Sequence, residues 1–245
     1  MAIDIQAIAT EEGQKPLRMI FNGNGTDDIS YLDALRAKSL PEVQRIADEL
    51  LNNYRLVSQV NQKGSRTAIE KCRRAATLNK YPWFNLSHIR DYLRFRTLLN
   101  EASDFEEVIR YFDHLQSQQR ISIVKIDFDK LFRPGAFGWR MIAIDIRIPS
   151  TDMLVEHYMT FRDMIEVNEA WLHKVYEAWR SASPDDLTLE DARVFRRDAR
   201  FSRHAYQELL FDGILSGQRT SPLAAQRKDT GDAILHELKY RLNLR

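Results

Sequence analysis

The stretch Gly138 to Arg180, GWRMIAIDIRIPSTDMLVEHYMTFRDMIEVNEAWLHKVYEAWR, contains two strand patterns followed by a helix pattern. In residues 139–148 isoleucine alternates with other residues, which is the period of a half-buried strand. A Pro-Ser-Thr-Asp turn follows, and residues 153–161 are again rich in β-type residues, so the two segments predict an antiparallel hairpin. From residue 162 to residue 180 the apolar spacing becomes helical, which predicts a helix that covers the hairpin.

The second strand of this hairpin carries a carboxylate, Glu156, among apolar residues. Its neighbours Val155 and His157 fall on the opposite face of the strand. A carboxylate in apolar surroundings is costly unless it is solvated, paired or bound to a metal. Glu156 is therefore a candidate functional residue.

The composition narrows the class of protein. The 245 residues carry a formal charge of only +1, so no overall field draws the chain to nucleic acid or to an anionic membrane. The single cysteine, Cys72, excludes an intramolecular disulfide. There is no apolar run of about 18 residues and no basic and apolar leader at the start, so we expect no membrane association and a cytoplasmic location.

The rest of the chain predicts helices alternating with strands. Asp28 or Ser30 can cap a helix that begins at Tyr31. Pro41 either splits this helix or lies in the first turn of a second one. Further elements are expected as a strand at 93–99, a helix at 104–115 and a strand at 121–128. The order predicts an α+β fold with a mixed, largely antiparallel sheet flanked by helices. The expected domains are an N-terminal arm at 1–30, a central domain at 31–183 and a helical extension at 184–245.

Three further features have a functional and a structural interpretation. Lys63, Thr67 and Lys71 are four residues apart and share one face if they lie on a helix, either as a solvated basic face or as a grip on phosphate. Asp91 precedes a strand, where an aspartate commonly caps the chain or faces solvent. His173 and Tyr176 on the covering helix suit a core or surface role as well as a site role.

Taken in order, these residues resemble the synthetase domain of the RelA/SpoT nucleotide pyrophosphokinases, from about residue 41 to residue 180. The motifs that carry the resemblance are Lys63-x3-Thr67-x3-Lys71, Asp91-Tyr92-Leu93-Arg94-Phe95-Arg96, Gly138-Trp139-Arg140, Glu156-His157-Tyr158 and His173-x2-Tyr176. The resemblance implies the RelA/SpoT-like nucleotidyltransferase fold, with Mg²⁺ as cofactor and ATP as one substrate.

The resemblance also implies a role for each motif. Lys63, Thr67, Lys71 and Arg96 would bind phosphates, Asp91 and Glu156 would hold Mg²⁺, and Trp139 beside Arg140 would stack the acceptor purine. Glu156 would in addition activate the 3′-hydroxyl of the acceptor. The implied reaction is Mg²⁺-dependent transfer of pyrophosphate from ATP to a purine nucleotide, as in (p)ppGpp or (p)ppApp synthesis, by a metabolic enzyme or a toxin.

Two alternatives stay open. The acceptor can instead be an RNA end, because arginines recur at three to four residues between Arg193 and Arg203 and can follow a phosphate backbone. The chain departs from the family pattern at Asn61, Ala143 and Tyr158, which also suits a non-catalytic nucleotide sensor or protein-interaction module on the same fold. The C-terminal helices would then, as in the enzyme, offer a surface for an oligomer or a protein partner.

Overall fold

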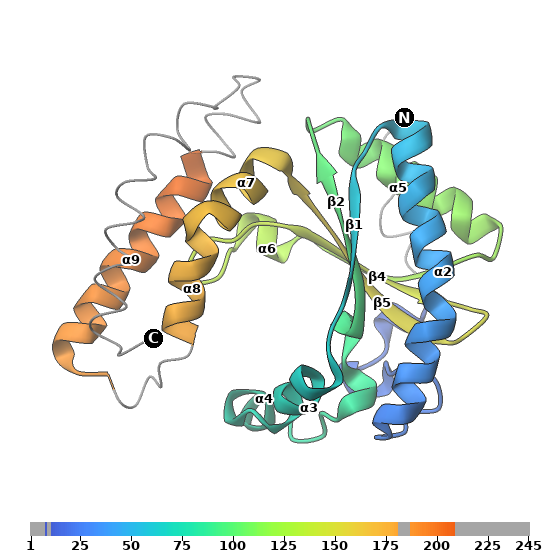
Figure 1. Cartoon of the computed structure of the whole chain (residues 1–245), viewed down its shortest axis with the longest axis horizontal. Coiled ribbons are helices and arrows are strands. Elements are labelled where there is room, and N and C mark those ends of the chain that lie inside the picture. Colours follow the sequence, from blue (N-terminus) through green and yellow to red (C-terminus); the bar gives the residue numbers. More distant parts are fainter. Residues whose placement is uncertain (1–7, 9–10, 181–186, 209–245) are drawn as a thin grey trace. The chain divides into compact units, whose positions relative to one another are not determined.

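The computed structural model describes residue 8, residues 11–180 and residues 187–208. Helices flank one five-stranded sheet with the strand order β1-β2-β5-β4-β3 (Figure 1). The expected α+β class with a mixed sheet is confirmed. The described residues fall into two compact units, the first within Met1–Leu99, Ser103–Phe128 and Ile142–Met159, and the second within Asn100–Ala102, Asp129–Met141 and Thr160–Arg245.

The sheet contains every strand that the sequence predicted and one that it did not. The strands are β1 Ser58–Gln62, β2 Leu93–Leu99, β3 Ser122–Asp127, β4 Ile142–Ile148 and β5 Met153–Phe161. The pairs β1–β2, β3–β4 and β4–β5 are antiparallel, so the expected hairpin is confirmed. The unpredicted strand, β1, reads Ser-Gln-Val-Asn-Gln and lies at the edge of the sheet, where a mostly polar strand has no alternating pattern to reveal it.

In its described residues from 11 on, the first unit also contains α-helices and short 3₁₀ turns. They are η1 Glu11–Gln14, η2 Leu17–Met19, α2 Ile29–Tyr54, α3 Ser65–Arg73, α4 Ala75–Lys80, η3 Leu86–His88, η4 Arg90–Tyr92 and α5 Asp104–Ser117. Asp28 caps α2 by accepting a hydrogen bond from the Ser30 backbone N–H, as expected. Pro41 lies inside α2 and does not split it, because the buried residues on both sides, among them Leu35 and Val43, favour a continuous helix despite the lost backbone bond.

One face of the sheet is buried against α2 and α5, which lie together on that side (Figure 1). His157 of β5 points to this face and is fully buried, with its ring 4.3 Å from Phe95 of β2 and 4.8 Å from Phe112 of α5. Its Nε2 is 2.8 Å from Thr97 Oγ1, whereas Nδ1 has no hydrogen-bond partner among the described residues. Because a charged ring would be desolvated here, burial lowers the pKa of His157 to about 3.

We expect His157 to make the protein sensitive to mild acid. Its pKa in the fold is below the ordinary 6.5, so the unfolded chain takes up a proton first and stability declines as the pH falls below about 6.5. Through His157, the free energy of unfolding should fall by up to about 1.4 kcal/mol per pH unit in this range. Urea unfolding between pH 7 and pH 4 should show a flatter decline in His157→Gln, and an unchanged one in the exposed control His114→Gln. Equal slopes in all three proteins would contradict the assignment.

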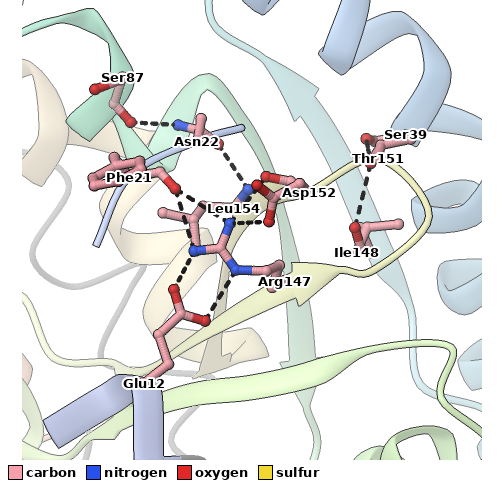
Figure 2. Close-up of polar contacts among 10 residues, drawn as sticks. All are labelled: Glu12, Phe21, Asn22, Ser39, Ser87, Arg147, Ile148, Thr151, Asp152 and Leu154. Atoms are coloured by element: carbon pink, nitrogen blue, oxygen red, sulfur yellow. Dashed lines mark hydrogen bonds and ion pairs between the residues drawn. The ribbon is translucent and has the colours of Figure 1, made fainter. Parts of the chain in front are cut away.

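The N-terminal arm is fixed to the β4–β5 hairpin by Arg147 (Figure 2). The Arg147 guanidinium donates from Nε to Glu12 Oε2 at 2.9 Å and from Nη1 to Asp152 Oδ1 at 2.7 Å, and it also donates to the Phe21 carbonyl oxygen. Burial alone would lower the pKa of Arg147, but the two carboxylates raise it, so the charge is retained. One side chain therefore joins the arm, the strand and the turn.

Asn22 completes this attachment and is itself fully buried. Its side chain donates to the carbonyl oxygens of Ser87 and Ile89, and its Oδ1 accepts from the Leu154 backbone N–H at 2.7 Å. Figure 2 shows the bonds to Ser87 and Leu154. Nearby, Ile20, Val124 and Leu154 form a small apolar cluster. Because Leu154 and Glu156 are two residues apart on β5, the arm covers one end of the sheet face that carries Glu156.

Replacing Arg147 by methionine should destabilise the protein by about 3 kcal/mol, because it leaves Glu12 and the Phe21 carbonyl without their donor. The ion pair of the exposed Arg45 with Glu42 provides a control, and Arg45→Ala should cost less than about 1 kcal/mol. Chemical denaturation of the three proteins measures both values. Equal losses in the two variants would show that the arm contributes little to stability.

The second unit is helical. It contains α6 Asp129–Phe132, α7 Arg162–Val167, a π-helical turn Asn168–Leu172, α8 His173–Arg180 and α9 Leu189–Glu208. The helix expected at 162–180 is thus present, with one π-helical turn in it. The buried Trp179 of α8 donates from Nε1 to Asp198 of α9 at 3.0 Å, which ties these two helices together.

Two predictions fall beyond this unit's described part. The boundary expected at residue 183 and residues 209–245 of the expected helical extension lie outside the described residues. None of the helices that the structure describes is long and apolar enough to cross a membrane.

Candidate active site

Asp91 lies in η4, immediately before β2, and two lysines converge on its carboxylate. Lys63 Nζ is 2.6 Å from Oδ2, and Lys71 Nζ is 2.8 Å from Oδ1. Lys63 follows β1, whereas Lys71 lies in the last turn of α3. Three of the residues singled out in the sequence therefore meet at one point.

The charges of this cluster support one another. Burial raises the pKa of Asp91, but the ammonium groups of Lys71 and Lys63 lower it more, to about 2. The carboxylate is consequently ionised at neutral pH, and it holds two cations in place. Such a cluster is suited to a polyanionic ligand, because a phosphate chain can exchange for the carboxylate as the partner of a lysine.

Helix α2 fixes the position of this cluster. Asp33 accepts hydrogen bonds from Ser65 at the start of α3 and from the Tyr92 hydroxyl, at 3.0 Å and 2.5 Å. Arg36, one turn further on, donates to the Lys63 carbonyl oxygen and lies over the Tyr92 ring at 4.5 Å. Helix α2 thus holds Lys63, the first residue of α3 and the residue that follows Asp91.

The sequence predicts one helical face for Lys63, Thr67 and Lys71, and this prediction is wrong for Lys63. Helix α3 begins at Ser65, and its N-cap Gly64 has an extended conformation with ψ of 146°. Lys63 therefore lies before the helix and reaches Asp91 from the end of β1. Thr67 lies one turn before Lys71 on α3 and its side chain is exposed to solvent.

Glu156 lies on the face of the sheet opposite to His157, as its place in β5 predicts. Its register partner on β4 is Asp145, so the two carboxylate-bearing residues are neighbours on this face. Arg96 of β2 alternates with the buried Phe95 and therefore also belongs to this face. Arg96 Nε donates to Gln59 Oε1 at 2.5 Å, across the β1–β2 pair.

Asp145 is a functional candidate that the sequence reasoning missed. It is 6% exposed and forms an ion pair with Arg90, the residue that precedes Asp91. Burial raises the pKa of Asp145, and Arg90 opposes that rise. On its other side Asp145 pairs in register with Lys125 of β3. The signal was present in the sequence, because Asp145 interrupts an isoleucine strand just as Glu156 interrupts its own.

Trp139 and Arg140 belong to the second unit. The Trp139 ring is part-exposed and packs edge-on against Tyr206 of α9 at 5.6 Å. Arg140 is buried, donates to the Leu131 carbonyl oxygen, and has its pKa lowered by burial. Gly138 before them has φ of +80°, and a Cβ there would lie 2.5 Å from the Arg203 Cα atom, so only glycine fits beneath α9.

His173 and Tyr176 share a face of α8, also in the second unit. His173 is exposed and lies 3.7 Å from Glu177 Oε1, and the Tyr176 ring packs edge-on against Phe137 at 5.8 Å. Tyr176 is 39% exposed. These contacts leave both side chains accessible to a ligand and give neither a specific chemical role.

The oxygen donors on the first unit suit a hard cation. Mg²⁺ commonly binds one or two protein carboxylates and completes its octahedron with water and phosphate oxygens. The part of the chain that the structure describes has no cluster of three or more His, Cys, Asp or Glu that would hold a metal by itself. Asp91 is ionised and Glu156 lies on the polar sheet face, so these two carboxylates are the donors that would fit such a cation.

No family model and no curated protein matches the chain. The solved structures that resemble it include a GTP pyrophosphokinase family protein from Streptococcus pneumoniae, at 14% identity and TM-score 0.46, covering 84% of this chain and 93% of that one. Small alarmone synthetase 1 from Bacillus subtilis bound to its product pppGpp matches at 15% identity and TM-score 0.49, covering 73% and 90%. Small alarmone synthetase 2 from the same organism matches at 18% and 0.47, covering 74% and 92%.

These proteins are of the kind that the ordered motifs resemble. The chain is similar to these pyrophosphokinase and alarmone synthetase structures in fold, and its ordered motifs separately resemble the RelA/SpoT synthetases.

The Asp91 cluster should give stability that disappears in acid. Because the pKa of Asp91 is lowered from 3.8 to about 2, its ionised form contributes about 2 kcal/mol above pH 4, and this is lost as the pH falls from about 4 to 2. The difference in unfolding free energy between wild type and Asp91→Asn should shrink over that range. Asp48→Asn, at an exposed aspartate of α2, should show no such trend. A difference independent of pH would contradict the ion-pair geometry.

Proposed function

We propose that this protein transfers pyrophosphate from ATP to the 3′-hydroxyl of a purine nucleotide. The observation that carries the proposal is the convergence of Lys63 and Lys71 on Asp91, in the segments whose motifs resemble the synthetase family. Glu156, on the polar face of the sheet, supplies the second carboxylate that the reaction requires. The purine acceptor class follows from the resemblance of Gly138-Trp139-Arg140 to the family's stacking motif.

The reaction requires one proton acceptor and several cations. The acceptor 3′-oxygen forms a bond to the β-phosphorus of ATP, the bond from that phosphorus to the α,β-bridging oxygen breaks, and AMP leaves with the electron pair. Glu156 takes the proton of the 3′-hydroxyl. Positioning and charge stabilisation provide most of the catalysis in such a transfer, so the protein's main task is to hold the phosphates in line.

Each candidate residue has a defined task in this proposal. Lys63 and Lys71 bind ATP phosphates, with Thr67 and Arg96 as further donors from α3 and β2. Asp91 and Glu156 would hold Mg²⁺, which neutralises charge on the phosphate oxygens when it is bound. Trp139 stacks the acceptor base, which contributes about 1 to 3 kcal/mol without fixing which purine is bound.

An RNA end is the second acceptor class, and α9 carries the observation that favours it. Arg196, Arg200 and His204 are four residues apart and share one face of this helix. Together with Arg197 and Phe201 they line a hollow of about 460 Å³. Cationic side chains around an aromatic ring suit a phosphate and its attached base.

The test is incubation of the purified chain with ATP labelled at the γ-phosphate, Mg²⁺ and, separately, GDP, GTP, ADP, AMP or tRNA. We expect label on an acceptor together with an equal amount of AMP. Glu156→Gln should lower kcat by about 10² to 10⁴-fold, as expected for loss of a general base. Asp91→Asn should lower it as well, through loss of the cation and of the lysine positions.

The acceptor that takes the label distinguishes the two classes, since transfer to tRNA alone would reject the nucleotide acceptor. His114→Gln, on the exposed side of α5, serves as the control and should retain full activity. Tight ATP binding with no AMP released for any acceptor would overturn the proposal and favour a nucleotide sensor on the same fold.

A further inference from the structure

An ion pair joins the two segments that carry the candidate metal-binding carboxylates. Arg90 and Asp91 are consecutive residues of η4. Asp145 and Glu156 are register partners on β4 and β5. The Arg90 guanidinium donates to Asp145 Oδ2. This bond therefore connects the residue next to Asp91 with the residue opposite Glu156.

The geometry of each end makes this bond an effective tether. Asp145 is almost fully buried on β4, and directly opposite residues of an antiparallel pair have Cβ atoms about 4.5–5.5 Å apart, so its position follows that of Glu156. At the other end, Asp91 has φ of −87° and ψ of 20°, which is not helical, so η4 is an irregular turn. An irregular turn needs outside contacts to fix where its side chains lie.

Stability alone gives little reason for such a pair. Replacing a buried ion pair by apolar side chains is often neutral or stabilising, because desolvation offsets the attraction. Leu154, two residues from Glu156 on the same face of β5, is fully buried, so this face of the sheet accepts apolar residues. Asp145 also stands directly opposite Glu156, where two carboxylates repel each other unless cations such as Arg90 and Lys125 lie beside them.

We propose that Arg90 and Asp145 are positioning residues that set the separation of Asp91 and Glu156, and thereby the affinity of the site for a divalent cation. This inference rests on the proposed function, in which Asp91 and Glu156 share that cation. Outer residues that orient metal ligands typically change metal affinity by 10 to 100-fold when they are mutated. Neither Arg90 nor Asp145 touches the substrate in this proposal, so each acts through its neighbour.

The experiment measures Mn²⁺ binding to the full chain by the loss of free Mn²⁺ signal in electron paramagnetic resonance, with saturating α,β-methylene-ATP. Arg90→Gln and Asp145→Asn should each weaken Mn²⁺ binding by about 10 to 100-fold. Binding of the metal-free analogue should stay as in the wild type, because Lys63 and Lys71 are intact. Arg90→Lys keeps the charge without the planar fork, and it should fall between wild type and Arg90→Gln.

Arg120→Gln is the matched control. Arg120 also forms ion pairs with partly buried carboxylates, those of Glu42 and Glu49, but away from the site. It should lose stability in thermal unfolding and retain wild-type Mn²⁺ affinity. If Arg90→Gln fails to fold, the isosteric Asp145→Asn and the charged Arg90→Lys carry the same measurement.

The outcomes separate the inference from the proposed function. Wild-type protein that binds Mn²⁺ and releases AMP, with folded Arg90 and Asp145 variants of unchanged affinity, overturns the inference alone. An equal loss of affinity in Arg120→Gln also overturns it, because general destabilisation would then explain the effect. Wild-type protein that neither binds Mn²⁺ nor releases AMP overturns both.

Discussion

The register of the β4–β5 hairpin is the constraint on which the rest of the structure depends. It sets Ile144 opposite His157 on the face covered by α2 and α5, and Asp145 opposite Glu156 on the other face. Because side chains alternate along a strand, a slip of one residue would move both carboxylates into the apolar core. Packing of the hydrophobic face therefore fixes the register of the strands. The same register fixes the positions of Asp145 and Glu156 on the polar face.

Much of the fold could be predicted because its decisive segments are locally periodic. The isoleucines of β4, the alternation of β5 and the run Leu93–Leu99 each identify a strand without reference to any other part of the chain. Strand β1 could not be found in this way, because its polar residues become a strand only through pairing with β2. Pro41 misled in the opposite sense, since packing of α2 on the sheet decides its continuity and no local pattern reports that packing.

The sequence named some of the residues that the structure brings together, but it did not show how they meet. Spacing and resemblance brought Lys63, Lys71 and Asp91 into one hypothesis, but the contact between residues 63 and 91 depends on how β1 and α3 meet β2. The Asn-Gly repeat at 22–25 is typical of a turn. Nothing local shows that Asn22 is buried and joins η3 to β5. Contacts across 60 or more residues are a property of the assembled sheet, which a single sequence does not reveal residue by residue.

Asp91 and Asp145 are buried and Arg147 is half-buried, and these charged groups of the first unit differ in what they hold. Arg147 joins the arm to the hairpin through several hydrogen bonds, which is a structural task that its many backbone acceptors explain. Asp91 and Asp145 instead hold cationic side chains, the two lysines and Arg90, each at the cost of desolvating a carboxylate. A chain selected for stability alone would have little reason to keep both. Cations that are already held in place need no reorganisation when a phosphate arrives, and this preorganisation is what a phosphoryl-transfer site gains from its buried carboxylates.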